Sequence, residues 1–468
     1  LFIFRFMHKP EIVKKLGSFL EAHQILTAEQ LQQRTYHIWK MDVALDVVAL
    51  LLPESTEDVA AILKTCSEAN QEVVVHGGLT NLVGSTEVES HQVVIAMDRM
   101  NTIEEVDPQS RTLTAQSGAI VETLIDRAAE HELLLPLNFG AKGSAQIGGA
   151  IATNAGGLRV FRYGMTRQMV LGLEAVLPDG RIVSSLKKIL KDNSGYDLKQ
   201  LFIGAEGTLG IVTKVILRLV EAPKSRISAL VAVDQYAQVI NLLKFLEKNL
   251  SGGLTGFELM WQNTYTTMTQ TLNQQQPPLP QEYPYYIFVE CLGSDVQKDY
   301  DQLETLIGEA LENEMIVDAA LMNTDRDLNH LWQIREDVSV LASQGKYDQH
   351  FDISLPIPKI GPLIAEIQSQ LEALPGVSHA FAFGHVADGN IHFIVGKDND
   401  SEATREAINK IVYAPLKANN GSVSAEHGIG LHKKDYLYTS RSETEIAVMK
   451  SLKNLFDPKH LLNPGRIF

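Results

Sequence analysis

The chain has 468 residues, of which 45% are hydrophobic and 21% charged, a composition typical of a folded protein with about three units of domain size. The formal net charge is −16, from 41 basic and 57 acidic residues, and this charge argues against nucleic-acid binding. The two cysteines, Cys66 and Cys291, lie far apart, so neither a disulfide framework nor a thiolate zinc site is expected and a reducing compartment is the default. The longest apolar stretch, residues 43–52, contains Asp46 and is too short to span a membrane.

The first 220 residues predict short strands and helices separated by many glycines. Residues 1–39 indicate a polar, helical segment, and residues 47–52 a strand. Residues 55–58, Ser-Thr-Glu-Asp, are typical of a helix start because their short side chains can cap the first turn. Residues 173–183 predict a hairpin that turns at Pro-Asp-Gly, residues 178–180.

The pattern changes after Pro223, where amphipathic helices alternate with strands and glycine becomes rarer. Residues 236–246 show helical spacing of apolar side chains, and residues 285–290 are typical of a strand. We therefore expect a second domain to begin near this proline.

Three glycine-rich segments, residues 76–85, 140–157 and 204–210, indicate close approach of the backbone to another group. Successive backbone N–H groups without Cβ atoms can hold a diphosphate, and Thr80 and Ser85 add hydroxyl donors. A single loop of this kind is equally consistent with a tight turn, but three favour a phosphate-bearing cofactor. None fits the nicotinamide fingerprint or the ATP phosphate loop, which argues against the usual nucleotide-binding folds.

Residues 140–164 and 191–204 resemble the FAD-binding domain of the vanillyl-alcohol-oxidase superfamily, in its D-2-hydroxyglutarate and D-lactate dehydrogenase branch. The resemblance covers about residues 40–468 and implies an α+β fold. After the helical segment at 1–39, it implies a two-subdomain FAD-binding domain of the PCMH type at 40–220 and a cap domain of antiparallel sheet and helices at 221–410. A mostly helical segment at 411–468 would complete the active site.

The resemblance implies non-covalent FAD, so a covalent bond to His76 is disfavoured. The first loop departs from the family pattern at Leu79, Asn81 and Ser85, although Asn81 could adopt the positive φ that the turn needs. The predicted cofactor-binding residues are His76, Gly77, Gly78, Leu79, Thr80, Asn81, Gly84, Ser85, Pro136, Gly140, Ala141, Gly143, Ser144, Ile147, Gly148, Gly149, Ile151, Thr153, Asn154, Gly157, Glu206, Gly207, Gly210, Ile211, Val212 and Asn463.

A metal site is suggested by residues 381–393, which predict two strands around an Ala-Asp-Gly-Asn turn flanked by His385 and His392. A lone histidine pair is more often structural, and spacing does not show whether Glu426 lies nearby. The resemblance places it there, and two imidazoles with one carboxylate suit Zn²⁺ or a similar ion. The resemblance also implies that His427 meets the substrate as the catalytic base, taking the hydroxyl proton while a hydride passes to flavin N5.

The expected substrate is a D-2-hydroxy acid, oxidised to a 2-oxo acid. Arg335 and Ser339 are four residues apart on a predicted helix, so a shared face could bind a carboxylate. Ser339 stands where the D-2-hydroxyglutarate pattern has Thr, His350 where it has a substrate-binding Lys, and Ile394 where it has Asn. D-2-hydroxyglutarate is therefore the first candidate, and D-lactate or glycolate the alternative.

A non-catalytic FAD-binding protein and a metal-dependent hydrolase are weaker alternatives, and no Gly-x-Ser-x-Gly motif supports the hydrolase. Without a nicotinamide fingerprint, an electron-transfer flavoprotein or a quinone is the expected acceptor. A homodimer stays open. The expected location is cytoplasmic, or the mitochondrial matrix in a eukaryote, without integral membrane association and with peripheral membrane contact left open.

Overall fold

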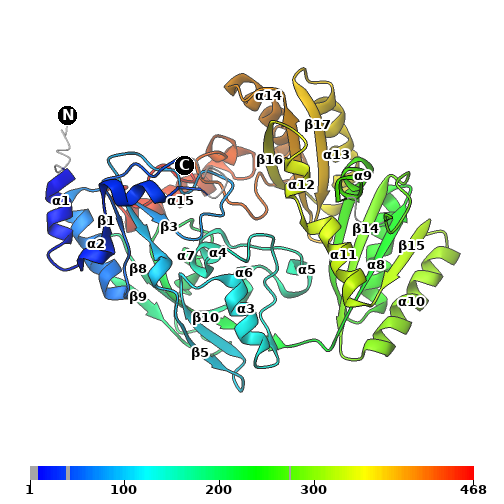
Figure 1. Cartoon of the computed structure of the whole chain (residues 1–468), viewed down its shortest axis with the longest axis horizontal. Coiled ribbons are helices and arrows are strands. Elements are labelled where there is room, and N and C mark those ends of the chain that lie inside the picture. The colour runs from blue at the N-terminus through cyan, green and yellow to red at the C-terminus, as the bar shows by residue number, and fades with distance from the viewer. Residues whose placement is uncertain (1–8, 38–42, 273–275) are drawn as a thin grey trace. The chain divides into compact units, whose positions relative to one another are not determined.

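The computed structural model describes residues 9–37, 43–272 and 276–468, drawn as ribbons in Figure 1. They form two compact units. Unit 1 comprises the chain up to residue 156, residues 164–222 and residues 426–468, and unit 2 comprises residues 157–163 and 223–425. Within the described ranges, no helix combines the length and apolarity that crossing a membrane requires. The four-part division predicted from the sequence stays a prediction.

A four-stranded sheet opens unit 1, in the order β1-β2-β4-β3, with β2, β4 and β3 parallel. The predicted helix start is confirmed, because Ser55 Oγ accepts a hydrogen bond of 3.0 Å from Asp58 N. The N-terminal segment is helical in part but also contributes β1, which pairs with β2. The elements are α1 (Lys9–Leu16), η1 (Ala22–Gln24), β1 (Ile25–Leu26), η2 (Ala28–Gln33), β2 (Ala49–Leu51), α2 (Thr56–Ala69), β3 (Val73–His76), β4 (Val93–Ala96) and η3 (Met97–Arg99).

A second sheet of unit 1 is antiparallel, with the order β5-β6-β10-β8-β9. The predicted hairpin is confirmed: Val176 pairs with Ile182, and Gly180 has a φ of +87° that favours glycine. The elements are β5 (Ile103–Asp107), β6 (Thr112–Gln116), α3 (Val121–Ala129), β7 (Leu133–Leu134), α4 (Ile147–Thr153), α6 (Thr166–Met169), β8 (Val170–Val176), β9 (Ile182–Ser185), α7 (Lys199–Phe202), β10 (Ile211–Arg218) and β11 (Val220–Glu221).

The C-terminal residues are built into unit 1 through a buried lysine. Lys453, on α15 (Glu443–Phe456), donates hydrogen bonds to Asp457 Oδ2 at 2.7 Å and to the carbonyl oxygens of Thr208 and Leu462 at 2.8 Å. Burial lowers the pKa of this lysine, while the Asp457 carboxylate acts in the opposite direction. One ammonium group therefore joins the C-terminal residues, which also include η5 (Lys434–Thr439), to residues 204–210.

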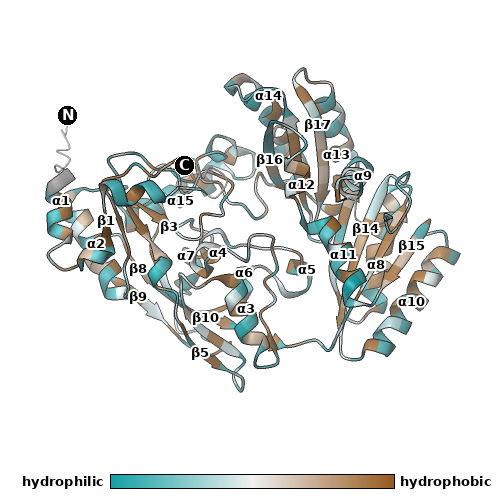
Figure 2. Cartoon of the chain, in the orientation of Figure 1, coloured by the Kyte–Doolittle hydropathy of each residue, from teal (hydrophilic) through white to brown (hydrophobic). Residues whose placement is uncertain are grey.

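Unit 2 is built on a seven-stranded antiparallel sheet with the order β15-β12-β14-β13-β17-β18-β16, as the sequence predicted for the cap. Helices α9, α11 and α12 pack on one face through an aromatic cluster, and α8, α10 and α13 contact the strands from the other side (Figure 1). The strands are mostly brown and the helices are teal and brown in Figure 2, which is the pattern of a sheet covered on both faces. The elements are α5 (Val160–Tyr163), β12 (Ser225–Val233), α8 (Tyr236–Asn249), β13 (Leu254–Trp261), α9 (Gln262–Leu272), β14 (Tyr285–Gly293), α10 (Val296–Glu312), β15 (Asp318–Met322), α11 (Asp325–Glu336), α12 (Ser339–Ala342), β16 (Tyr347–Ser354), α13 (Ile357–Glu372), β17 (Val377–Gly384), β18 (Asn390–Lys397), α14 (Glu402–Tyr413) and η4 (Lys417–Asn419).

Residues 157–163 join unit 2 through a buried ion cluster around Glu290 on β14. Glu290 accepts hydrogen bonds from Arg159 Nε at 3.0 Å, from Arg226 Nε at 2.8 Å and from Thr255 Oγ1 at 3.0 Å. Burial acts to raise the pKa of Glu290, but the two guanidinium groups outweigh it and the net pKa is lowered. The carboxylate is therefore charged and holds two cations at the sheet.

We expect Glu290→Gln to lower the free energy of unfolding by about 3–5 kcal/mol, because it leaves two guanidinium groups without their buried counter-ion. Urea unfolding followed by circular dichroism measures the effect. Glu312→Gln, at the exposed end of α10, is the control and should change the unfolding midpoint little. Equal midpoints for the two variants would contradict this account of the cluster.

Candidate active site

The first glycine-rich loop follows β3 and is closed by the side chain of Asn81. Its Oδ1 accepts hydrogen bonds from Val83 N at 3.3 Å and Ser85 N at 2.9 Å, and its Nδ2 donates to Thr86 Oγ1 at 2.7 Å. The positive φ in this part of the loop belongs to Leu79, at +59°, and not to Asn81. Asn81 therefore does not disrupt the turn, as the sequence allowed, and it stabilises the turn through its amide group without a positive φ.

The first two glycine-rich loops pack against each other. A Cβ atom on Gly78 would lie 2.1 Å from Ser144 O, and one on Gly148 would lie 2.7 Å from Ser117 Cβ. The backbone N–H groups of Ile147 and Gly148 donate to the carbonyl oxygens of Ala119 and Ser117. Gly78 and Gly148 are therefore required by packing within the protein and give no evidence for a ligand.

Other positions in the same loops leave room for a ligand. A Cβ atom on Gly140 or Gly149 would meet no atom within 4 Å. Gln146 Oε1 and Ser117 Oγ are buried, and neither has a hydrogen-bond partner among the described residues. Open backbone beside unsatisfied buried polar atoms fits a polar cofactor such as the predicted FAD.

His76 lies at the end of β3 and is buried, with Nε2 donating to the Thr86 carbonyl oxygen at 2.9 Å. Burial lowers the pKa of His76 to about 4, so its imidazole is neutral near pH 7. This hydrogen bond ties the two ends of the first loop together.

Glu206 connects three segments of unit 1. Its carboxylate accepts from Ile429 N at 2.7 Å and Gly430 N at 2.8 Å, and its carbonyl oxygen accepts from Asn463 Nδ2 at 2.8 Å. Burial raises the pKa of Glu206 in spite of these hydrogen bonds. The segment after His427 is therefore fixed to residues 204–210, and a Cβ atom on Gly207 would lie 2.6 Å from Asn463 Nδ2.

The remaining predicted cofactor residues lie in several segments, among them α4 and the start of β10. Asn154 is the left-handed C-cap of α4, and its Oδ1 accepts from Arg167 N at 2.9 Å. Their contact with a cofactor stays a prediction. Thr80, Gly84, Ser85, Pro136, Ala141, Gly143, Gly210, Ile211 and Val212 belong to unit 1, Ile151 and Thr153 lie in α4, and Gly157 begins the residues 157–163 of unit 2.

The predicted histidine hairpin is confirmed: β17 and β18 pair antiparallel, with Phe383 opposite His392. His385, His392 and Glu426 each offer one ligand atom, and these atoms lie within 4.8 Å of one another. Glu426 directly follows Ala425, whose N–H donates to Asp352 Oδ2 at 3.1 Å. The structure brings the three predicted ligands together, and their chemistry suits a divalent metal ion.

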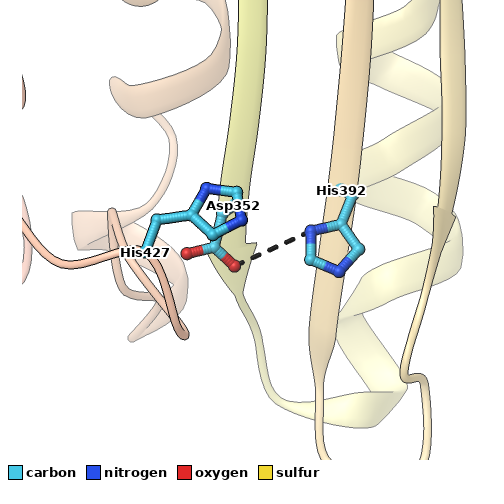
Figure 3. A group of neighbouring side chains, drawn as sticks. All are labelled: Asp352, His392 and His427. Atoms are coloured by element: carbon cyan, nitrogen blue, oxygen red, sulfur yellow. Dashed lines mark ion pairs between the residues drawn. The ribbon is translucent and has the colours of Figure 1, made fainter. Parts of the chain in front are cut away.

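Asp352 was missed by sequence reasoning. It forms a second group with His392 and His427 and lies on β16, 3.8 Å from His392 Nδ1 (Figure 3). It is fully buried and accepts hydrogen bonds from Asn390 Nδ2 and Ser424 Oγ. The signal in the sequence was a carboxylate between two buried apolar residues of one strand.

Glu258 on β13 was also missed. Its Oε1 accepts from His385 Nδ1 at 2.6 Å, and its Oε2 accepts from Arg335 Nε at 2.9 Å and Nη2 at 2.6 Å. Burial acts to raise the pKa of Glu258, but the charges of His385 and Arg335 outweigh it and the net pKa is lowered. A single glutamate in the apolar strand 254–261 was the available signal.

Arg335 and Ser339 do not share a helical face, so that prediction is wrong. Helix α11 ends at Glu336, and Asp337, with ψ of 66°, separates it from α12, which begins at Ser339. The Asp337 carboxylate accepts a hydrogen bond from Ser339 Oγ, which stabilises the break. Arg335 is buried, whereas Ser339 is exposed.

Two of the three departures from the D-2-hydroxyglutarate pattern, His350 and Ile394, face each other in the sheet. His350 on β16 pairs directly with Ile394 on β18, two residues along from the Asp352 and His392 pair. His350 Nε2 lies 2.7 Å from Asp348 Oδ2, and Ile394 is buried in the aromatic cluster of unit 2. The polar and apolar substitutions are therefore neighbours on one face, next to the histidine group.

Comparison with known proteins gives matches over most of the chain. Residues 222–467 match the family model of FAD linked oxidases, C-terminal domain, and residues 47–185 match that of an FAD binding domain. A mitochondrial protein of Schizosaccharomyces pombe named as a D-lactate dehydrogenase is 38% identical over 423 residues, 88% of this chain and 80% of the relative. The mitochondrial D-2-hydroxyglutarate dehydrogenase of Danio rerio is 36% identical over 415 residues, 89% of this chain and 77% of the relative. The solved structure of p-cresol methylhydroxylase with substrate bound has the same fold, with a TM-score of 0.77 and 15% identity over 98% of this chain and 96% of that chain.

We expect Gly149→Ala to weaken FAD binding by about tenfold or more, which corresponds to 1.4 kcal/mol, because the methyl group would occupy the open space beside α4. Flavin absorbance of the purified protein and titration of the apoprotein with FAD measure the effect. Gly308→Ala, in the middle of α10, also adds a methyl group to open space in a helix and is the matched control. Equal FAD affinity of the two variants would remove Gly149 from the cofactor site.

Proposed function

The chain belongs to the family of FAD-linked oxidases, in which it is an FAD-dependent 2-hydroxy-acid dehydrogenase, and we propose that it oxidises D-2-hydroxyglutarate with the help of a divalent metal ion. The observation that carries the proposal is the group of His385, His392 and Glu426. The similarity to a D-2-hydroxyglutarate dehydrogenase over 89% of the chain supports the substrate.

In this proposal His385, His392 and Glu426 hold the metal ion. When bound, a divalent ion such as Zn²⁺ supplies a Lewis acid that lowers the pKa of the substrate's 2-hydroxyl group. Glu258 accepts a hydrogen bond from His385 Nδ1 at 2.6 Å and would orient that ring, whereas Asp352 lies 3.8 Å from His392 Nδ1. These buried carboxylates account for the rigid placement of the group.

His427 is the proposed general base, which takes the proton of the substrate hydroxyl group. The segment that follows it is fixed by Glu206, and the residues that precede it are fixed by Asp352. FAD, when held by the glycine-rich loops, would supply the acceptor, flavin N5, for the hydride of the substrate's Cα. The product is the 2-oxo acid.

The remaining features of the proposal rest on the relatives and on the sequence. An electron-transfer flavoprotein or a quinone would reoxidise the flavin, since the sequence lacks a nicotinamide fingerprint. The mitochondrial relatives from fission yeast and zebrafish support a matrix location in place of the cytoplasmic default.

A second candidate substrate is D-lactate or glycolate, and the sheet register favours it. Ile394 and His350 lie beside the histidine group, where the D-2-hydroxyglutarate pattern has Asn and Lys. An imidazole and an apolar side chain bind a distal carboxylate more weakly than an ammonium group and an amide do. The relative named as a D-lactate dehydrogenase supports the same reading.

We expect the protein to reduce a dye acceptor with D-2-hydroxyglutarate faster than with D-malate, D-lactate or glycolate, and to lose activity with a chelator. Steady-state rates on this panel, with and without chelator, measure both expectations together. His427→Ala should abolish turnover and retain FAD, because the base is lost and the FAD loops are intact. Inactivity on all four acids would contradict the proposed class of substrate, and chelator-resistant turnover would contradict the role of the metal ion.

The double variant His350→Lys, Ile394→Asn should shift specificity towards D-2-hydroxyglutarate. One charge-assisted hydrogen bond contributes about 1.5–3 kcal/mol, so kcat/KM for D-2-hydroxyglutarate relative to D-lactate should rise about ten- to a hundredfold. His330→Lys, at a partly buried position of α11, adds the same charge outside β16 and β18 and is the control. An unchanged ratio would show that these two positions do not select the substrate.

A further inference from the structure

We propose that Glu258 is a positioning residue that holds His385 and Arg335 in one rigid unit, with His385 as a metal ligand and Arg335 as the residue that binds the substrate carboxylate, an inference that rests on the proposed function. Glu258 lies on β13, whose neighbour in the sheet is β17. Since Leu259 pairs with Gly384 and Met260 with Phe383, the next position places Glu258 opposite His385. Strand register, and not a flexible loop, therefore sets the distance between these two side chains.

Arg335 reaches the same carboxylate from α11. Its guanidinium carbon lies 5.0 Å from the centroid of the Phe383 ring, and its Nε and Nη2 donate to Glu258 Oε2. One carboxylate oxygen of Glu258 thus accepts a hydrogen bond from the imidazole, and the other accepts hydrogen bonds from the guanidinium group. A movement of either partner would break a charge-assisted hydrogen bond in a buried site.

All three side chains are removed from water: Glu258 is 1% exposed, Arg335 7% and His385 9%. A carboxylate only accepts hydrogen bonds, so His385 Nδ1 carries the proton and Nε2 is the nitrogen that can coordinate a metal ion. Glu258 also neutralises Arg335, whose charge would otherwise repel a divalent cation at His385. One residue therefore fixes the tautomer of the ligand and lowers the positive charge beside the metal ion.

The pairing also determines which part of Arg335 can meet a substrate. Nε and Nη2 are engaged by Glu258, whereas Nη1 has no hydrogen-bond partner among the described residues. The carboxylate of a 2-hydroxy acid would therefore meet Arg335 through Nη1 and the outer hydrogen of Nη2. Loss of Glu258 should affect metal binding and substrate binding together, because both partners lose their fixed orientation.

The test compares the FAD-bound wild-type protein with Glu258→Gln, using Zn²⁺ alone as the probe. The amide can accept one hydrogen bond but brings no charge, so we expect Zn²⁺ affinity in a chelator competition to fall about 10–100-fold. The visible spectrum of bound Co²⁺ should change, KM for the 2-hydroxy acid should rise, and the FAD content should stay the same. Wild-type Zn²⁺ affinity and an unchanged Co²⁺ spectrum in Glu258→Gln would overturn the proposal.

Glu290→Gln is the matched control, because it also removes a fully buried carboxylate with two cationic partners from the same sheet. Glu290→Gln should keep the wild-type Zn²⁺ affinity. If Glu258→Gln and Glu290→Gln lose equal Zn²⁺ affinity, the loss reflects general destabilisation and the proposal is overturned. If Glu258→Gln does not fold, Glu258→Asp replaces it in the test. Aspartate keeps the charge but is one methylene too short to reach both partners, so we expect an intermediate loss of Zn²⁺ affinity.

Wild-type Zn²⁺ affinity of Glu258→Asp would contradict the bridging role. Failure of the wild-type protein itself to bind Zn²⁺ would contradict the metal-assisted function and the positioning role with it. If the wild-type protein binds Zn²⁺ and Glu258→Gln binds it with the same affinity, the positioning role alone is overturned.

Discussion

A carboxylate buried in an apolar sheet must be paired, and unit 2 is organised around this constraint. Glu258 and Glu290 lie on the neighbouring strands β13 and β14, Asp352 lies on the edge strand β16 of the same sheet, and all three are almost completely removed from water. Each would be destabilising alone, because the cost of burying an unpaired charge is several kcal/mol. Each is instead surrounded by donors that come from other elements. The residues proposed for chemistry are thus placed by the same pairs that keep the sheet intact.

Much of the fold could be predicted from local patterns. The capped start of α2, the hairpin turning at residues 178–180 and the histidine hairpin all follow from short-range rules of side-chain type and spacing. The antiparallel sheet of unit 2 and the FAD family followed from the resemblance, and the structure and relatives confirm both. Local sequence determines local geometry when the turn or cap has one favourable conformation.

The rest depends on contacts between distant segments, which periodicity does not report. Leu79 takes a positive φ, and Asn81 Oδ1 accepts the hydrogen bonds that close the loop. The helix around Arg335 ends early because Asp337 binds Ser339. Glu258 and Asp352 escaped notice because each is a single acidic residue whose partners lie tens of residues away. In a sequence, such residues can be recognised only because a single ionisable side chain interrupts an apolar strand.

The path of the chain between the two units has a consequence for dissecting the protein. The chain passes from one unit to the other after residues 156, 163, 222 and 425. A fragment that ends at residue 222 would lack the partners of Glu206 beyond residue 426, and a fragment of residues 223–425 would lack Arg159. Neither fragment therefore contains all the interactions that stabilise its own unit. Recombination between relatives would have to exchange the interleaved segments together to preserve both cores.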